Sequence, residues 1–486
     1  MGVLTIKEVI GATGGRVISG NADDSLITGV SIDSRTIREG EIFIALKGER
    51  FDGHAFLLEA MNKGKAAIVS TPPAVQLRGR TVMYVKNTLK ALQDIAHHVR
   101  MRGKATVVGI TGTNGKTTTK ELISSILGRK YRVMKSSGNL NNHIGLPLSL
   151  IRLDERDEVA VMEMGASIQG DIQLLCDIAS PDYGVITNIG PAHLEGFGSI
   201  EGVRSTKLEL FDAVKSIAVN ADDRFLMEGV AERSRERRPD IITFGMENPS
   251  DVSARDIVLE ERDSVFTLGL PNGERIRVVL RLNGTFNIAN ALAAAAVCSA
   301  MGVGTEDIKE GIESFQGVPM RLEFKDLYGA TVISDVYNAN PASMEEAVKE
   351  LVRQRRKRAI AVLGDMLELG AYAENVHRNL GRWMSGLPVD VLIAVGPLMA
   401  KTAEEFSAAR RGDSPCGHES PENGAPPVVA VATDASDARR ILLGICGKGD
   451  TILVKGSRGM SMERVLGEDH RDISDLQEKR EVGNAL

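Results

Sequence analysis

Residues 106–120 constrain the fold most, because they read as an apolar run, a glycine-rich turn and the start of a helix: TVVGITGTNGKTTTK. A glycine-rich bend lets successive backbone N–H groups face one anion, and a helix that begins near Thr117 adds the positive end of its dipole. Lys116 can reach the β- and γ-phosphates of a nucleotide, and the Thr117 hydroxyl can bind Mg²⁺. This order of elements therefore predicts a phosphate-binding loop.

The loop departs from the usual G-x-x-x-x-G-K-[ST] pattern, because Gly109 lies one residue too early and Ile110 stands where the first glycine belongs. The alternative is a glycine-rich strand-to-helix turn with a chance lysine. Since strand, turn, Lys-Thr pair and helix come in the right order, we favour nucleotide binding. The candidate residues are Gly112, Thr113, Asn114, Gly115, Lys116, Thr117 and Thr118.

Length and charge limit the other possibilities. A chain of 486 residues is too long for one hydrophobic core, so several domains are expected. The net charge of −6 argues against nucleic acid as the main partner. The four cysteines form no C-x-x-C pair, which predicts neither a zinc site nor a disulfide framework and favours the cytoplasm. No apolar run is long enough to span a bilayer, and residues 291–303 are interpreted as a buried helix.

The pattern of strands and helices divides the chain into three α/β domains. Residues 1–102 have strand patterns at 29–32 and 41–46 and helix patterns at 55–62 and 88–100, and the basic stretch 100–104 is a candidate linker. Residues 103–317 alternate strands with helices, which predicts a central, doubly wound, mostly parallel sheet with helices on both faces.

The third domain, residues 318–486, also has the pattern of a mainly parallel sheet. Its predicted strands lie at 331–334, 359–363, 391–395, 428–431 and 451–454. We expect a solvated loop at 411–427 and a highly charged tail from Glu468.

Two side chains at strand ends extend the nucleotide hypothesis. Glu163 ends a strand-like run, and α/β sheets bind ligands at the carboxyl ends of strands, so Mg²⁺ held between Thr117 and Glu163 would bridge phosphate oxygens. His193 follows the next strand and is a candidate for a second cation or for the transferred phosphate. For Glu163 the alternative is a strand-end acid that a helix cap or a lysine satisfies. For His193 it is a structural histidine, and for Lys207, in a helix-like stretch, it is a solvated charge.

Five stretches together resemble the Mur ligase family of peptidoglycan synthesis. They are GTNGKT at 112–117, EMG at 163–165, TNIGPAHLEGFG at 187–198, VNADD at 219–223 and NGTFNIANAL at 283–292. The resemblance spans nearly the whole chain. It implies ATP-dependent amide-bond formation through an acyl phosphate on three domains: 1–102 for the UDP-linked substrate, 103–317 as a P-loop ATPase-type domain, and 318–486 as a Rossmann-like acceptor domain.

Three further stretches resemble one branch of that family, whose members add D-alanyl-D-alanine to UDP-N-acetylmuramoyl-tripeptide. They are GNLNNHIGLP at 138–147, DVYNANPASM at 335–344 and LGDMLELG at 363–370. A related branch carries an Asp-Asn-Pro-Arg motif, which does not occur in this sequence. The resemblance implies those two substrates as partners, and we expect a monomer.

The resemblance also assigns residues to sites. Lys116, Glu163, His193 and Lys207 are the candidate catalytic residues, and Thr117, Glu163, His193 and Lys207 would hold two Mg²⁺ ions. In several family members the lysine that matches Lys207 is carbamylated, which makes it a metal-binding carboxylate. ATP would further contact Asn287, Asn290, Arg321 and Asp335. The alternative for either asparagine is a helix cap, and the alternative for Arg321 is an interdomain salt bridge.

The two organic substrates have candidate sites of their own. For the UDP-linked substrate these residues are Ser31, Ser34, Arg35, Lys47, Asp52, Gly53, His54, Asn139 and Asn142. A dipeptide carboxylate needs a cation or N–H groups, which a strand followed by Lys-Gly-Ser-Arg provides. The candidate acceptor residues are Asn338, Asn340, Glu368, Lys455, Ser457 and Arg458.

Two other functions stay open on sequence alone. A folylpolyglutamate-synthase-like ligase would share the phosphate loop, but residues 31–35 and 51–54 argue against it. A P-loop regulatory protein would bind nucleotide and hydrolyse it slowly, independent of any small carboxylate.

Overall fold

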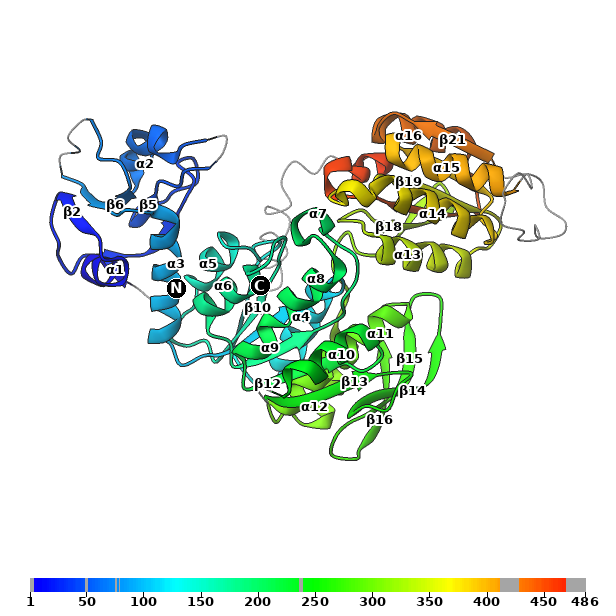
Figure 1. The fold of residues 1–486 in the computed structure, drawn as a ribbon, viewed down its shortest axis with the longest axis horizontal. Helices are drawn as coiled ribbons and strands as arrows, with labels where there is room; N and C mark the ends of the chain where they lie inside the picture. The colour runs from blue at the N-terminus through cyan, green and yellow to red at the C-terminus, as the bar shows by residue number, and fades with distance from the viewer. Residues whose placement is uncertain are drawn as a thin grey trace.

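The protein consists of three lobes, each built on its own sheet, in a computed structural model (Figure 1). The model describes residues 4–48, 51–74, 77, 79–235, 239–410 and 428–468. The expected loop at 411–427 and the tail beyond Glu468 lie outside these residues. The predicted α/β class with mainly parallel sheets is confirmed.

The first lobe contains a five-stranded sheet in the order β2-β7-β6-β5-β4, parallel except for the β2–β7 pair, and a small β1–β3 pair. The helix expected at 55–62 begins as a 3₁₀ turn, which the Asp52 carboxylate caps by accepting the N–H of His54. The elements are β1 (Leu4–Thr5), α1 (Ile6–Thr13), β2 (Arg16–Ser19), β3 (Leu26–Ile27), β4 (Gly29–Ser31), β5 (Glu41–Ile44), η1 (Gly53–Phe56), α2 (Leu57–Lys63), β6 (Ala66–Val69), β7 (Thr81–Tyr84) and α3 (Thr88–Arg102).

Helix α3 joins the first lobe to the second. It runs to Arg102 and so includes the first part of the predicted linker. Arg100 donates to the carbonyl of Ala179 at 3.0 Å and to the carboxylate of Asp182 at 2.9 Å, so the end of α3 is fixed to the central lobe. The predicted domain boundaries stay predictions.

The central lobe contains a nine-stranded sheet in the order β16-β15-β14-β13-β12-β11-β8-β10-β9. The strands from β9 to β14 are parallel, and β15 and β16 extend the sheet antiparallel. The strands are β8 (Thr106–Thr111), β9 (Val133–Lys135), β10 (Val159–Glu163), β11 (Tyr183–Ile186), β12 (Ser216–Asn220), β13 (Asp240–Gly245), β14 (Val252–Leu259), β15 (Ser264–Gly269) and β16 (Arg275–Leu280).

Helices cover both faces of this sheet, as expected for a doubly wound fold (Figure 1). Helices α4, α11 and α12 share one core with the sheet, and α11 is the predicted buried helix, whose alanines allow close packing. The helices are α4 (Lys116–Leu127), α5 (Gly145–Leu150), α6 (Asp171–Ala179), α7 (Leu194–Phe197), α8 (Ile200–Lys207), α9 (Glu209–Ala213), α10 (Arg224–Arg233), α11 (Thr285–Ala300) and α12 (Thr305–Ser314).

The third lobe contains a six-stranded sheet in the order β17-β18-β22-β19-β20-β21, parallel except at β17. All five strands predicted there are present. The elements are β17 (Glu323–Leu327), β18 (Ala330–Asp335), α13 (Pro341–Arg353), β19 (Ala359–Gly364), η2 (Gly370–Tyr372), α14 (Ala373–Ser385), β20 (Val391–Val395), α15 (Pro397–Arg410), β21 (Val428–Ala432), α16 (Ala435–Ile445), β22 (Thr451–Lys455), η3 (Arg458–Met460) and η4 (Met462–Leu466).

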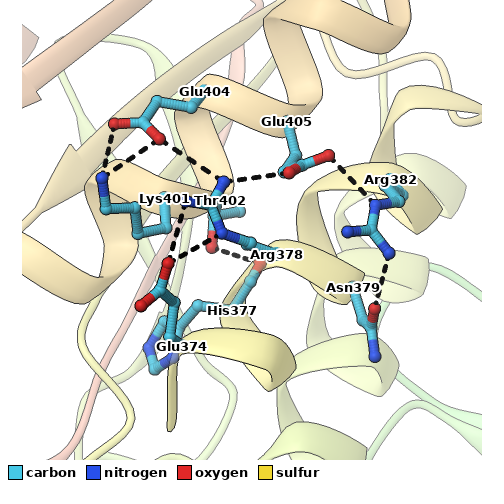
Figure 2. A network of polar contacts seen from close by, with 9 residues as sticks. All are labelled: Glu374, His377, Arg378, Asn379, Arg382, Lys401, Thr402, Glu404 and Glu405. Atoms are coloured by element: carbon cyan, nitrogen blue, oxygen red, sulfur yellow. Dashed lines mark hydrogen bonds and ion pairs between the residues drawn. The ribbon is translucent and has the colours of Figure 1, made fainter. Parts of the chain in front are cut away.

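Helices α14 and α15 of this lobe are joined by a network of polar contacts (Figure 2). Arg378 of α14 contacts Glu374 on its own helix and the paired acids Glu404 and Glu405 on α15. The Thr402 hydroxyl donates to the backbone carbonyl of His377 at 2.8 Å. The network fixes α14 against α15.

Among the described helices none is both long enough and apolar enough to cross a bilayer.

Replacing Gly311 by alanine is expected to destabilise the central lobe. An added Cβ would lie 2.5 Å from the Cα of Ile126, so α12 must move away from α4, the helix that follows the phosphate loop. We expect a loss of about 1–3 kcal/mol in the free energy of unfolding, seen as a lower melting temperature. Gly444→Ala in α16 is the control, because no heavy atom lies within 4 Å of the added Cβ. Equal melting temperatures for the two variants would contradict the packing argument.

Candidate active site

A cavity of about 540 Å³ lies between the central and third lobes. The phosphate loop forms one wall, and the segments that follow β18 and β19 form the other. Of the predicted site residues, those that line it are Gly112, Thr113, Asn114, Gly115, Lys116, Thr117, Asn139, Asn142, Glu163, His193, Lys207, Arg321, Asn338, Asn340 and Glu368.

The phosphate loop has a conformation that only glycine fits at two positions. Gly112 has φ of 145° and Gly115 has φ of 82°. A Cβ at these positions would lie 1.9 Å from the Thr187 hydroxyl oxygen and 2.1 Å from the Asn290 Oδ1, respectively. Helix α4 begins directly after Gly115, and within the described chain no side chain caps it. The first N–H groups of α4 are therefore available to an anion.

The buried Lys207 and the half-buried Lys116 share one carbonyl oxygen of this loop. Lys116 Nζ lies 2.9 Å from the oxygen of Gly112, and Lys207 Nζ lies 3.0 Å from the same atom. Burial lowers the pKa of Lys207 well below its usual value, and the charge of Lys116 lowers it further. Burial also lowers the pKa of Lys116, although Glu163 opposes that shift. Lys207 is thus not the solvated helix charge that its sequence context allowed.

Glu163 has two neighbours that fix its carboxylate at the end of β10. The Thr117 hydroxyl donates to Oε2 at 3.0 Å, and the Asn141 amide donates to Oε1 at 2.9 Å. Asn141 lines the cavity but was not predicted, although it lies between Asn139 and Asn142 in a stretch already singled out. Within the residues that the structure describes, no group of three His, Cys, Asp or Glu side chains is arranged to bind a metal.

Two polar contacts connect the central lobe to the third across the cavity. His193 Nδ1 lies 2.8 Å from Glu368 Oε2, and this hydrogen bond lowers the pKa of the Glu368 carboxyl. The Asn114 and Asn340 amides donate to each other, at 2.7 Å and 3.4 Å. Hence His193, a predicted metal ligand, and Asn114 of the phosphate loop each pair with a predicted acceptor residue.

Arg321 faces an aromatic ring. Its guanidinium carbon lies 4.2 Å from the centroid of Tyr337, and both side chains line the cavity. Burial raises the pKa of the Tyr337 hydroxyl. Tyr337 was not singled out from sequence, where it stands between Asp335 and Asn338. The ring restricts where the Arg321 cation can lie.

Four predicted site residues of the third lobe support its loops and do not line the cavity. Lys455 and Asp335 form a buried ion pair at 2.5 Å, and Lys455 also donates to the carbonyl of Asn338 at 3.0 Å. The Ser457 hydroxyl accepts the N–H of Leu367 at 2.9 Å. Arg458 pairs with Glu463 at 2.9 Å. Direct contacts of these residues with a ligand stay predictions.

Asn287, Asn290 and Thr118 also lie outside the cavity lining, behind the phosphate loop. The Asn287 amide donates to the carbonyl of Asn283 at 2.7 Å, four residues earlier on α11. Asn290 accepts the Thr119 hydroxyl at 3.4 Å. Both asparagines are buried, and here they support the loop from behind.

The predicted residues for the UDP-linked substrate divide between two lobes. Asn139 and Asn142 line the cavity, whereas Ser31, Ser34, Arg35, Lys47, Asp52, Gly53 and His54 lie on the first lobe. In that group Asp52 binds His54 Nδ1 at 2.6 Å, and His54 Nε2 accepts the N–H of Ser70 at 2.9 Å. Ser34 donates to Glu59 at 2.9 Å, and Arg35 pairs with Asp33 at 2.6 Å. These contacts organise the loops that follow β4 and β5.

Comparison with known proteins gives a consistent picture along the chain. Residues 26–100 match the model for the Mur ligase family catalytic domain, 110–298 the Mur ligase middle domain, and 320–458 the Mur ligase glutamate ligase domain. The UDP-N-acetylmuramoyl-tripeptide–D-alanyl-D-alanine ligase of Bacillus subtilis is 35% identical over 473 residues, which are 95% of this chain and 97% of that protein.

Solved structures agree with the sequence comparison. MurF from Acinetobacter baumannii superposes with a TM-score of 0.86 at 32% identity, covering 96% of this chain and 98% of that one. MurF ligase from Thermotoga maritima, solved in complex with ADP, gives a TM-score of 0.76 at 30% identity, with 90% and 96% covered.

Replacing Lys207 by methionine is expected to stabilise the ligand-free protein. Methionine retains an unbranched apolar side chain and removes a buried amine, while the oxygen of Gly112 still accepts from Lys116. We expect a gain of about 1 kcal/mol at pH 7, measured as a higher unfolding midpoint.

The gain should shrink as the pH rises toward 10. The pKa of Lys207 is lower in the folded state, so the unfolded chain binds more protons and the unsubstituted protein gains stability with rising pH. Lys86→Met, at an exposed lysine, is the control and should show neither effect. A lower midpoint for Lys207→Met at pH 7 would show that the bond to Gly112 outweighs the desolvation of the amine.

Proposed function

This chain belongs to the Mur ligase family, and from that premise we propose that it joins D-alanyl-D-alanine to UDP-N-acetylmuramoyl-tripeptide and converts ATP to ADP and phosphate. The product would be the UDP-N-acetylmuramoyl-pentapeptide of peptidoglycan synthesis. The observation that carries the proposal is the shared cavity, in which the phosphate loop faces third-lobe residues such as Asn338 and Glu368. A reaction between a phosphorylated group and an incoming amine requires that both bind in one cavity.

The residues of the cavity fit a nucleotide with a divalent cation. At Gly112 and Gly115 the loop has no space for a side chain. The first N–H groups of α4 are available to phosphate. Thr117 and Glu163 place two hard oxygen donors 3.0 Å apart, the type that Mg²⁺ prefers. When bound, Mg²⁺ would neutralise charge on the phosphate oxygens. We assign the first ion to Thr117 and Glu163, and a second to His193 and Lys207.

The proposed chemistry follows from the weakness of a carboxylate as an acyl donor. ATP first phosphorylates the terminal carboxylate of the tripeptide, and the dipeptide amine then displaces phosphate. Negative charge grows on phosphate oxygens in both steps, so positioned cations contribute most to the rate. Lys116 would exchange its carbonyl partners, Gly112 and Thr113, for phosphate oxygens.

Contacts between the lobes support a role for closure in this reaction. The Asn114–Asn340 and His193–Glu368 contacts join the third lobe to the central lobe. Arg321, from the segment before β17, lines the cavity, and closure would place it there. A site completed only by closure excludes water and so favours transfer to the tripeptide over hydrolysis.

We also propose that Lys207 is carbamylated in the working enzyme. Its lowered pKa favours the neutral amine, which is the form that adds CO₂. The carbamate would supply an anionic oxygen ligand, and Lys116 lies beside it to balance that charge.

The location and assembly of the protein belong to the same proposal. ATP and a UDP-linked precursor, the proposed substrates, favour the cytoplasm as its place of action. A monomeric state and the roles assigned to the three domains stay predictions.

The proposed function predicts how phosphate release depends on the substrates. With ATP, Mg²⁺ and UDP-N-acetylmuramoyl-tripeptide, sustained release should require D-alanyl-D-alanine, and mass spectrometry should detect the UDP-pentapeptide. Release without either substrate would favour the regulatory P-loop alternative. No release here, but release with a folate carrier and glutamate, would favour the folylpolyglutamate-synthase-like alternative.

Replacing Lys207 by alanine tests the carbamate. We expect kcat to fall by roughly 100-fold or more, because a metal ligand is lost. Added formate or acetate should restore part of the rate by placing a carboxylate in the space left by the side chain. Lys116→Ala is the matched control, since an ammonium there cannot be replaced by a carboxylate. Rescue of neither variant, or of both, would argue against the carbamate.

A further inference from the structure

A short segment after β19 carries cavity residues of the third lobe. This segment, residues 365–369, is called the acceptor lip below, and Leu367, Glu368 and Leu369 line the cavity from it. Behind the lip lies His377, a fully buried residue of α14 that does not line the cavity. We propose that His377 is a positioning residue that holds the acceptor lip in place for the dipeptide. The proposal rests on the function proposed above.

Both ring nitrogens of His377 have partners that define their roles. Nε2 lies 3.0 Å from the backbone nitrogen of Met366, which can only donate, so Nε2 must accept. Nδ1 lies 2.7 Å from the carbonyl oxygen of Ala373, which can only accept, so Nδ1 must carry the proton. The ring is therefore neutral in a single tautomer. Burial lowers the pKa of His377, which agrees with this state.

The bond to His377 is one of several that fix the start of the lip. The carboxylate of Asp365 accepts the N–H of Met399 at 2.6 Å, and the N–H of Leu367 donates to Ser457 at 2.9 Å. Met366, between them, is itself buried and depends on the ring of His377. Three successive residues are thus anchored directly before Glu368.

Glu368 takes an unusual backbone conformation at the end of this anchored stretch. Its φ is +64°, in the left-handed region, where residues other than glycine are strained. Such a conformation persists only where neighbouring contacts hold it, and the anchored residues 365–367 provide them. A shift of the lip would therefore displace the carboxylate of Glu368.

The acceptor is the substrate that this displacement should affect. A dipeptide carries an ammonium group at neutral pH, and a carboxylate is its natural partner. The side chain of Glu368 is about two-thirds exposed, whereas Glu163 is buried and bound by Thr117 and Asn141. Glu368 also lies on the wall opposite the phosphate loop, from which the amine must approach.

Helix α14 is itself fixed by contacts with α15 (Figure 2). Thr402 of α15 donates to the backbone carbonyl of His377, and Arg378 pairs with Glu405. His377 therefore connects a rigid helix pair to the lip through one ring.

Two variants at this position separate positioning from general stability. His377→Leu removes the acceptor for the Met366 N–H, and His377→Gln retains a side-chain oxygen that can accept it. For the leucine variant we expect the KM for D-alanyl-D-alanine to rise about tenfold, as for the loss of one hydrogen bond, with the KM for ATP and for the UDP-tripeptide within twofold. The glutamine variant should recover most of this loss.

Thr402→Val is the matched control, because it removes a buried hydrogen bond to the same residue but leaves the ring in place. It should lower the melting temperature without changing the KM for the dipeptide. If Thr402→Val raises that KM as much as His377→Leu does, or if leucine and glutamine behave alike, the positioning role is overturned. Should the leucine variant fail to fold, His377→Asn, whose amide is too short to reach Met366, takes its place with the same expectation.

Hydrogen exchange of the substrate-free protein tests the anchor independently of the reaction. Amides of residues 366–369 should exchange faster in the leucine variant and at the normal rate in the glutamine variant. Unchanged exchange would overturn the anchor itself. Faster exchange with an unchanged dipeptide KM would overturn only the link to the acceptor, and a wild-type protein without dipeptide-dependent phosphate release would instead reject the proposed function.

Discussion

The packing of the phosphate loop against its own lobe is the constraint on which the site depends. Thr187 and Asn290 leave no room for a side chain at Gly112 or Gly115, so the loop is fixed between the end of β11 and helix α11. Because the loop is fixed, the carbonyl oxygen of Gly112 stays available to both Lys116 and Lys207. Lys116 is therefore in place before an anion arrives, which is the condition under which electrostatic stabilisation of phosphate is most effective.

The polar contacts across the cavity, between the central and third lobes, are individually weak. The pair His193–Glu368 is partly exposed, with 34% and 64% of the side chains accessible, and such pairs contribute about 0–1 kcal/mol. The reciprocal amides of Asn114 and Asn340 add about 0.5–1.5 kcal/mol for each hydrogen bond. These sums are small beside the free energy of binding a nucleotide, so the contacts across the cavity alone would not keep the lobes closed. Outside the cavity lining, Arg353, Gln354 and Arg356 of the third lobe also contact Leu259 and Glu261 of the central lobe.

Elements that depend on residues close together in the chain could be predicted from the sequence. Contacts between residues far apart in the chain could not. The phosphate loop, the strand that ends at Glu163 and all five strands expected in the third lobe follow from short patterns, and they are present. The pairing of Asp335 with Lys455 joins residues 120 positions apart and arises only because β18 and β22 are neighbours. Asn287 and Asn290, which the resemblance assigns to ATP, lie on α11 behind the loop. The roles assigned to most site residues, and the domain boundaries, stay predictions.

The balance of charge in the cavity explains why a buried lysine is tolerated beside another. Glu163 accepts hydrogen bonds from Thr117 and Asn141, and it compensates the charge of Lys116 only in part. The amine of Lys207 donates to the carbonyl of Gly112 and not to Glu163. Two ammonium groups on one carbonyl would repel each other, and the site avoids this by favouring a neutral Lys207. A neutral amine there costs less to bury, and a carbamate formed on it would turn repulsion from Lys116 into attraction. Under the carbamate proposed above, the lysine that is least favourable as a cation would become an anionic ligand.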